Sequence, residues 1–555
     1  MQLLAIGQSN IILTGNPQKT FFRTTFKTYS PFGMQRFRLS HEGQRTLSVE
    51  NDTVFEFKIP RYADLLWDTY IVVNIPDIWS PIYYRDDLGT GNGKYLPYEF
   101  KWVKELGFTM IRQVTIHSGG SVLAQYSGEW MANAVKRDEC SKQTLINRMI
   151  GHDTDTEELT NPSKQNNGEY PHAIYDADCT SGLEPSIRGR KLYIPLMAWF
   201  CASTKTALPL IALQYQEINV KIEFRPIKEL FTILKVTQEK DDDACLKVPA
   251  PMNDKKHQLQ RIAPDTTNTA YQFWRFIQTP PNLPTTTEEN DSLYKKRRVD
   301  WKTDIHLLAT YIFLGNEERR TITAKKHRFL TRCQYQWDYL NLSGPQRVNI
   351  PSRNMVSSYM WRFRRTDVYM RNEWHNYQNY EFENEIQNQI ESPTNILTTD
   401  NPMNLKTRKC KNVENIKDIL FDMSILCGQE YRENILDAGV YNYVEKVHRT
   451  TGIAKDGLYC YNFCTNSNHY AYQPTGAQNT NKWKHITFDF NTILPPKNTC
   501  DDNSVEILCD ASNNLLGIRK NNVRIYKYNF DLRIFEERYN TIEIQGGRIG
   551  MLFAR

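Results

Sequence analysis

The sequence predicts an all-β protein that is divided into two sandwich domains. Two observations support this fold class. Apolar and polar residues alternate along many short segments, and the chain of 555 residues is too long for one ordinary domain. Two domains of about 200 to 250 residues would fit this length. Amphipathic helices of three or more turns are hard to find, so packed sheets should form most of the core.

Two segments show the period-two alternation of a half-buried strand most clearly. The first spans residues 218–225, is stopped by Pro226, and carries its apolar side chains on one face: Ile218, Val220, Ile222 and Phe224. The second spans residues 526–534 and has a similar apolar face: Tyr526, Tyr528, Phe530, Leu532 and Ile534. Shorter examples are Phe55, Phe57 and Ile59, and then Ile486, Phe488 and Phe490. The apolar run at residues 208–215 is typical of a strand that is buried on both sides.

Polar stretches that contain proline separate the strand-rich blocks. The longest are expected to be surface loops: residues 153–185, 237–265 and 279–291. Two of these three loops fall between residues 231 and 300, which makes this stretch the best candidate for the junction between the two domains. We therefore expect this division of the chain: residues 1–230 for an N-terminal segment and the first domain, 231–300 for a junction and loop region, and 301–555 for the second domain.

The charge of the chain does not indicate specific nucleic-acid recognition. The net charge of +6 arises from 69 basic and 63 acidic residues, a small imbalance for this length. The densest basic clusters are residues 295–298 and the group Arg362, Arg364 and Arg365. We interpret both clusters as solvated loops or rims. Contact with packaged nucleic acid is the alternative interpretation.

The 11 cysteines are scattered without paired spacing, which predicts free thiols in a reducing compartment. In an extended strand, Cys460 and Cys464 would lie about 13 Å apart, too far for a disulfide or a shared zinc ion. We expect two small buried side chains. The chain starts without a basic region followed by a long apolar stretch, and no apolar run approaches the roughly 20 residues of a spanning helix. A cytosolic protein, or one assembled in the cytosol, is expected.

A search for catalytic and phosphate-binding motifs finds only incomplete matches. The glycine-rich run at residues 89–93, followed by Lys94, superficially resembles a phosphate-binding loop. However, Leu88 stands where the motif needs its first glycine, and Tyr95 stands where Ser or Thr would bind magnesium. A hairpin loop is the favoured interpretation.

Nucleophile and metal motifs are also incomplete. Ser121 and Ser127 lack the flanking glycines of a nucleophile elbow, and no two histidines are spaced four apart on a helical pattern. The acidic residues between 153 and 158 lack the glycine and the bidentate glutamate of a calcium loop. They are interpreted as a solvated loop, as is the run at 241–243. We therefore expect no catalytic, cofactor-binding or metal-binding residues and no cofactor.

Several blocks of the sequence follow the pattern of one viral family. The most specific is LTGNPQKTFF at residues 13–22, within a longer match over residues 4–32. Further blocks follow in order: residues 102–130, which end in Gly128-Glu129-Trp130, then 194–196, 208–215, 307–320, 457–476, 539–542 and 546–547. Together, these blocks resemble the major capsid proteins of nucleocytoplasmic large DNA viruses along nearly the whole chain.

The resemblance implies a fold and a structural role. The fold would be two tandem eight-stranded jelly-roll sandwiches with long inserted loops. The implied role is that of a major capsid protein without enzymatic activity: a homotrimer that forms pseudo-hexagonal capsomers and tiles the icosahedral shell of a large double-stranded DNA virus. The expected location is the capsid shell of the virion, assembled in the host cytoplasm. The N-terminal segment would lie toward the inside.

The same resemblance implies the partners of the protein. These are neighbouring capsomers, minor capsid and penton proteins, and the internal membrane layer through inner-face proteins. Two alternatives stay open. One is a related viral scaffolding protein that is absent from the mature particle. The other is a jelly-roll protein that binds or cleaves sugars, which would need a pair of carboxylates facing each other across a cleft.

Overall fold

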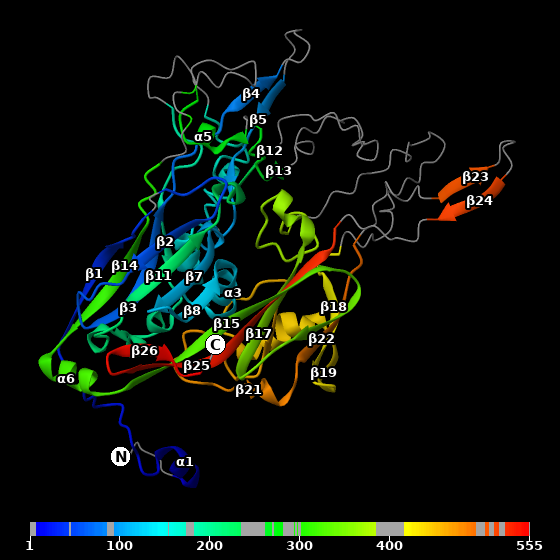
Figure 1. Ribbon diagram of the computed structural model, residues 1–555. Helices are drawn as coiled ribbons and strands as arrows, with labels where there is room; N and C mark the ends of the chain where they lie inside the picture. Colours follow the sequence, from blue (N-terminus) through cyan, green and yellow to red (C-terminus); the bar gives the residue numbers. More distant parts are fainter. Residues whose placement is uncertain are drawn as a thin grey trace.

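The fold is known for most of the chain. The computed structural model describes residues 7–43, 46–85, 94–153, 155–173, 183–234, 261–268, 271–280, 294, 297, 301–384, 416–495, 505–509, 515–520 and 528–553. Within these ranges, antiparallel sheets dominate, as the alternation predicted, and the chain folds as two sandwiches (Figure 1). None of the helices in these ranges has the length and apolar character needed to span a membrane.

The first sandwich contains a five-stranded and a four-stranded sheet. The five-stranded sheet is built from β1 (Phe32–Ser40), β14 (His306–Leu314), β3 (Leu65–Asn74), β10 (Leu208–Pro209) and β9 (Lys191–Pro195). The four-stranded sheet is built from β2 (Thr53–Lys58), β11 (Ile218–Phe224), β7 (Ile111–Ser118) and β8 (Ser121–Ser127). Apolar side chains from both sheets, such as Ile71 and Val220, belong to one core.

The second sandwich contains a six-stranded and a four-stranded sheet. The six-stranded sheet is built from β15 (His327–Leu342), β25 (Phe530–Gln545), β17 (Met355–Arg365), β20 (Leu458–Asn462), β21 (Gln478–Asn479) and β26 (Arg548–Met551). The four-stranded sheet is built from β16 (Pro345–Ile350), β22 (Ile486–Thr492), β18 (Leu420–Cys427) and β19 (Glu430–Asp437). Its core is centred on Trp361 and Phe488. Double jelly-roll architecture is thus present, but the expectation of eight strands in each unit is not confirmed.

The connections carry short helices and smaller sheets. The helices are α1 (Ile11–Thr14), α2 (Leu106–Thr109), α3 (Gly128–Asp138), α4 (Gln143–Met149), α5 (Phe273–Phe276), α6 (Asn316–Ala324), η12 (Val440–Val444) and α7 (Glu445–Arg449). The remaining strands are β4 (Ile82–Arg85), β5 (Lys94–Pro97), β6 (Lys101–Trp102), β12 (Phe231–Leu234), β13 (Arg261–Ile262), β23 (Val505–Cys509) and β24 (Leu515–Lys520). Helix α3 has 11 residues, about three turns, and was overlooked in the sequence, where amphipathic helices of this length were hard to find.

The strand predictions can be checked one by one. In β11, the four apolar residues are buried and the residues between them are less buried, as predicted. β2 shows the same strict alternation, and the apolar residues of β22 are buried. The run at 208–215 was wrongly predicted as a buried strand: β10 has only two residues, and a 3-10 helix follows at Leu210–Ala212. Pro209 lacks a backbone N–H, which limits further pairing.

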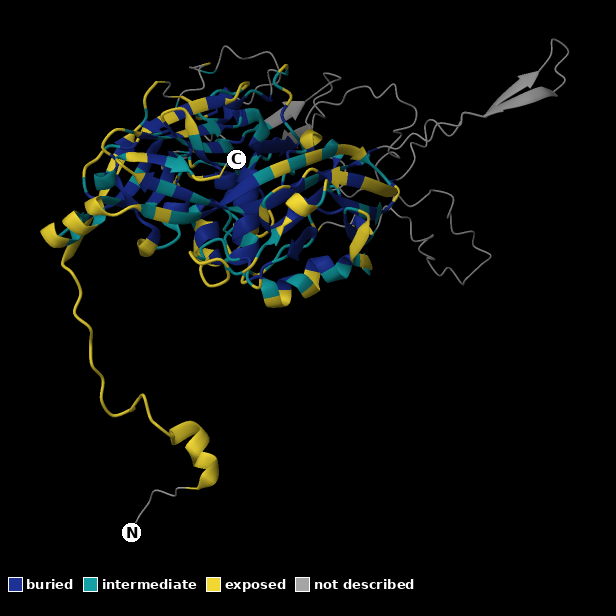
Figure 2. Cartoon of the chain, turned by 60° about the horizontal axis from the view of Figure 1, so that its bottom comes forward, coloured by how far each residue is buried: buried dark blue, intermediate teal, exposed yellow. Residues whose placement is uncertain are grey.

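The chain crosses between the two sandwiches after the expected junction. β14 begins at His306, beyond the boundary that we expected at residue 300, and it pairs with β1 and β3 in the first sandwich. β15, which follows α6, is the first strand of the second sandwich. Ahead of β1, residues 7–31 form an N-terminal arm that is exposed throughout and extends away from both sandwiches (Figure 2).

Candidate functional site: the helix between the two sandwiches

Helix α3 connects the two sandwiches and begins with the Gly128-Glu129-Trp130 motif. Ser127 caps the helix by accepting a hydrogen bond from the backbone N–H of Trp130 at 3.3 Å. A Cβ atom at Gly128 would lie 2.2 Å from the carbonyl oxygens of Phe108 and Ile111. Only glycine therefore allows the start of α3 to lie this close to the backbone of the first sandwich.

Glu129 forms ion pairs with two arginines of the second sandwich. Its carboxylate lies 2.5 Å from Nε of Arg362 in β17 and also binds Nη1 of Arg533 in β25. Burial would raise the pKa of Glu129, but the charges of Arg362 and Arg533 outweigh burial and hold that pKa well below its ordinary value. Glu129 is therefore ionised at neutral pH, and the first turn of the helix also favours its negative charge.

A second ionic cluster surrounds Glu537 of β25. Trp130 Nε1 donates a hydrogen bond to this carboxylate at 3.1 Å, and Arg137 Nη2 donates one at 2.9 Å. Arg332 of β15 lies 3.7 Å from the same group. Burial would raise the pKa of Glu537, but the charges of Arg137 and Arg332 lower it to about 2. This carboxylate therefore binds side chains from both sandwiches in one fully buried cluster.

The C-terminal end of α3 is capped by a loop of the second sandwich. The backbone N–H of Gly452 donates to the carbonyl of Arg137 at 2.7 Å, and that of Ala454 donates to Lys136 at 3.0 Å. The hydroxyl of Thr451 donates to the carbonyl of Asp138. The last carbonyls of a helix have no partner within the helix, so this loop satisfies groups that would otherwise be buried unpaired.

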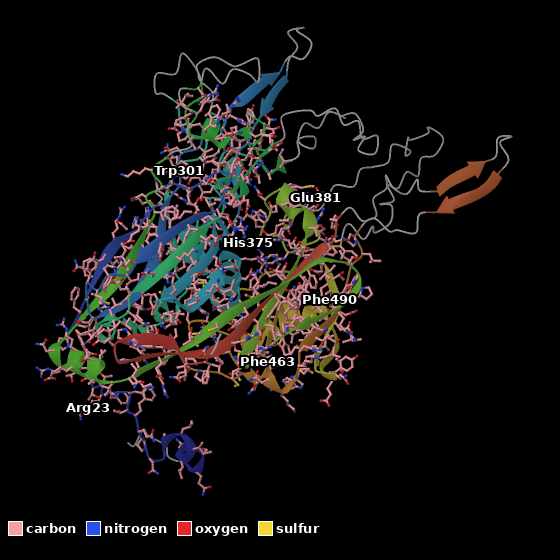
Figure 3. All side chains as sticks on the ribbon, in the orientation of Figure 1. Arg23, Trp301, His375, Glu381, Phe463 and Phe490 are labelled. Atoms are coloured by element: carbon pink, nitrogen blue, oxygen red, sulfur yellow. The ribbon has the colours of Figure 1, made fainter. Side chains whose placement is uncertain are left out.

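A third charged cluster lies beside α3, where His375 appears between the two sandwiches (Figure 3). His375 Nδ1 lies 3.6 Å from Glu105, which also pairs with Lys136 of α3 at 3.4 Å. Burial lowers the pKa of His375 to about 4, although the charge of Glu105 acts in the opposite direction. Nearby, Lys455 and Lys104 both pair with Glu383.

Apolar side chains also pack across the junction, by which we mean the contact region between the two sandwiches. The core of the first sandwich includes side chains from the second half of the chain: Met360, Tyr377, Leu458, Cys460, Phe535, Ile542, Ile544 and Ile549. The turn between β25 and β26 also meets the first sandwich, since the N–H of Tyr215 donates to the carbonyl of Gly547 at 3.1 Å. Because polar and apolar contacts both bridge the junction, the two sandwiches hold one fixed orientation.

The structure corrects the interpretation of one basic cluster. Arg362, Arg364 and Arg365 were predicted to form a solvated rim, but on β17 Arg362 and Arg365 are buried and Arg364 is half-buried. Arg362 and Arg365 are 1% and 3% exposed, and Arg365 pairs with Asp367 at 2.6 Å. Burial and the charge of Arg362 lower the pKa of Arg364 to about 9. The sequence could not reveal the acidic partner of Arg362 because Glu129 lies 233 residues away.

The other candidate residues are not assembled into a site. Ser127 caps α3, and three of the acidic residues at 153–158 pair with surface cations: Asp153 and Asp155 with Arg148, and Glu157 with Lys164. Cys460 and Cys464 are buried free thiols, as predicted. Arg297 is exposed, whereas the rest of the 295–298 run, the glycine run at 89–93 and the acidic run at 241–243 lie outside the described residues.

No arrangement typical of metal binding is found in the described part of the chain, and the hollow between the sandwiches lacks the carboxylates of a glycosidase. The search over those residues finds no group of three or more His, Cys, Asp or Glu side chains that could hold a metal ion. A hollow at the junction is lined by Tyr126, Trp199, Arg332, His469 and Tyr472, among others, and no carboxylate lines it. A pair of carboxylates across this cleft, which a glycosidase would need, is therefore not formed there.

Comparisons with known proteins agree with this architecture. Residues 20–255 match the family described as the major capsid protein N-terminus. The major capsid protein of Chrysochromulina ericina virus is 25% identical over 385 residues, which cover 65% of this chain and 56% of that protein. The major capsid protein of Phaeocystis pouchetii virus is 28% identical over 238 residues, 41% of each chain. The chain thus spans about half the length of these curated relatives.

Solved structures extend the likeness to the whole fold. A subunit of the PBCV-1 virus capsid superposes with a TM-score of 0.58 at 14% identity and covers 97% of this chain and 100% of its own. The Faustovirus major capsid protein superposes with a TM-score of 0.57 at 10% identity, over 97% of this chain and 94% of its own. The chain is therefore similar in sequence, over part of its length, to the major capsid proteins of nucleocytoplasmic large DNA viruses, and it shares their double jelly-roll fold.

Proposed function

We propose that this protein is a structural major capsid protein, whose trimers form pseudo-hexagonal capsomers in the icosahedral shell of a large double-stranded DNA virus. The proposed role requires no catalysis and no cofactor. The observation that carries the proposal is the buried set of contacts around α3, which fixes two similar sandwiches side by side in one chain. Three such rigid pairs around one axis present six similar sandwiches, the outline that a hexagonal lattice needs.

The energetics of the junction support this proposal. A subunit whose two sandwiches moved independently would lose conformational freedom each time that it entered a lattice. Here, Glu129 and Glu537 are already paired inside the free subunit, so this ordering precedes assembly. A subunit that is already rigid can then assemble into a lattice through many weak contacts that act together.

The decisive measurement is the oligomeric mass of the full-length protein. Size-exclusion chromatography with light scattering is expected to give three times the chain mass of 65.2 kDa, and electron microscopy of the same fraction is expected to show six-cornered particles. A protein that remained monomeric at all accessible concentrations and salt conditions would contradict the proposal. A glycan-binding screen tests the sugar-binding alternative, which predicts a signal from the isolated protein.

We further propose that the subunit resides in the capsid shell and that assembly takes place in the host cytoplasm. Its partners would be neighbouring capsomers, minor capsid and penton proteins, and the internal membrane layer through inner-face proteins. The second candidate function is a scaffolding protein of the same fold that is discarded before maturation. Peptide mass spectrometry of purified mature virions separates the two: a shell protein dominates the spectrum, whereas a scaffold is absent.

A further inference from the structure

The N-terminal arm, residues 7–31, carries apolar side chains that nothing in the free subunit covers. All of its residues are exposed, the arm leads away from the sandwiches (Figure 2), and Arg23 lies outside them (Figure 3). Its large apolar residues are between 63% and 98% exposed: Ile11, Ile12, Leu13, Phe21, Phe22, Phe26 and Tyr29. Such a density of exposed apolar residues is typical of a segment that binds another surface.

The charge of the arm has a single sign. Residues 7–31 contain Lys19, Arg23 and Lys27 and no acidic residue. The three cations are spaced four residues apart, so in an extended chain they lie on one side, about 13 Å from one another. The base of the arm is held by a hydrogen bond from Ser30 to Glu318 of α6 at 2.8 Å. The arm therefore fits a partner surface that is both apolar and acidic.

The second sandwich has a surface of this kind, which we call the acidic apolar patch: Tyr443, Val444, Val447, Asp418 and Asp437. The three apolar residues lie along η12 and α7 and are between 53% and 71% exposed. Asp418 and Asp437 are exposed and form no ion pair with any described residue. Burial raises the pKa of Asp418, the charge of Lys417 lowers it, and the charges of Asp456 and Asp437 raise it, so three carboxylates gather around one lysine. A further cation placed here would relieve the repulsion between these carboxylates.

We propose that the arm of one copy binds the acidic apolar patch of a second copy, so that successive copies are tied together around the symmetry axis. This inference rests on the proposed self-assembly and names the surfaces that it uses. The arm leaves the first sandwich while the patch lies on the second, and such a head-to-tail contact closes into a ring. Twenty-five extended residues reach roughly 80 Å, well beyond the radius of gyration of about 24 Å expected for a compact chain of this length.

The contact can be tested by disulfide trapping in the full-length protein. The double variant Thr25→Cys with Val447→Cys is expected to form covalent trimers under mild oxidation, visible on a non-reducing gel. Each single variant serves as the control for the native thiols, of which Cys140 is exposed. Mixing the two single variants is expected to give covalent dimers, which shows that the bond joins two copies. Trimers without any of these cross-links would overturn the inference and leave the proposed function intact.

Charge reversal provides an independent test. The variant Arg23→Glu with Lys27→Glu is expected to weaken self-association about tenfold, as the loss of two favourable charge contacts implies. Adding Asp418→Lys to the same chain should restore part of that loss. The matched control, Lys221→Glu with Lys484→Glu, makes the same charge change at exposed positions elsewhere and should leave association unchanged.

The remaining outcomes are also decisive. Flotation of the protein with phosphatidylserine-containing vesicles, in the absence of cross-links, would overturn the inference and assign the arm to a lipid surface. A wild-type protein that never self-associates would contradict both this inference and the proposed function. The arm lies outside both cores, so none of the arm variants removes a core contact and loss of folding does not obscure the result.

Discussion

Replacing Glu129 by glutamine should strongly destabilise the junction between the sandwiches. Glu129→Gln keeps the shape of the side chain but leaves Arg362 and Arg533 without their shared counter-charge. Arg362 is 1% exposed, so it cannot recover that energy from water. Removing one partner of a buried ion pair costs about 3–5 kcal/mol. In a domain of about 150–250 residues, the size of one sandwich, each kcal/mol lowers the Tm by about 2–4 °C, so a fall in Tm of about 10 °C is expected.

The assay is differential scanning calorimetry of the variant beside a matched control. Asp489→Asn makes the same carboxylate-to-amide change in an ion pair with Arg347, whose side chain is 60% exposed, and should leave the Tm nearly unchanged. Limited proteolysis of the Glu129 variant is expected to cut between the sandwiches first. Equal Tm values for the two variants would show that the Glu129 cluster does not hold the junction and would refute this reasoning.

Three further predictions concern packing, pH and thiol exposure. Gly128→Ala should abolish soluble expression or lower the Tm sharply, because the new Cβ would meet the backbone oxygens of Phe108 and Ile111. The control Gly33→Ala has open space around the new Cβ and should match the wild-type protein in yield and Tm. His375 has a pKa of about 4 in the folded protein, against an ordinary value of 6.5, so between these pH values only the unfolded chain takes up a proton. Urea unfolding should therefore show the free energy of unfolding falling by about 3 kcal/mol as the pH drops from 6.5 to 4. A His375→Phe variant with the same pH dependence of stability would contradict this. A maleimide should label Cys140 in the native protein but label Cys460 only after denaturation, and rapid native labelling of Cys460 would show that the junction opens.

The strands of both sandwiches were predictable because their pattern is local. Ile218, Val220, Ile222 and Phe224 point to one face in any strand, and one apolar face is enough to identify a half-buried sheet. The two-residue strand at Leu208–Pro209 was not predictable from its apolar run alone. Burial without alternation does not distinguish a strand from a turn or a helix.

Helix α3 was missed for a related reason. Its polar residues Glu129, Asn133 and Arg137 lie on one side at helical spacing, but this side faces the second sandwich instead of water, so ten of its eleven residues are buried. The basic cluster on β17 was misjudged because its partners lie far away in the sequence. A run of arginines is usually solvated, and only the three-dimensional contact with Glu129 shows that Arg362 is an interior residue.

The pairing of distant segments has a consequence for how the chain is made on the ribosome. Strand β14 must find β1 across more than 260 residues, and the carboxylate of Glu537 pairs with Arg137, 400 residues away in the sequence. Until β25 is synthesised, Arg137 has its ion pair with Asp138 but lacks Glu537, and the turn before β26 cannot close on Tyr215. The contacts between the two sandwiches can therefore form only after β25 has been made, so the first sandwich reaches its final packing together with the second.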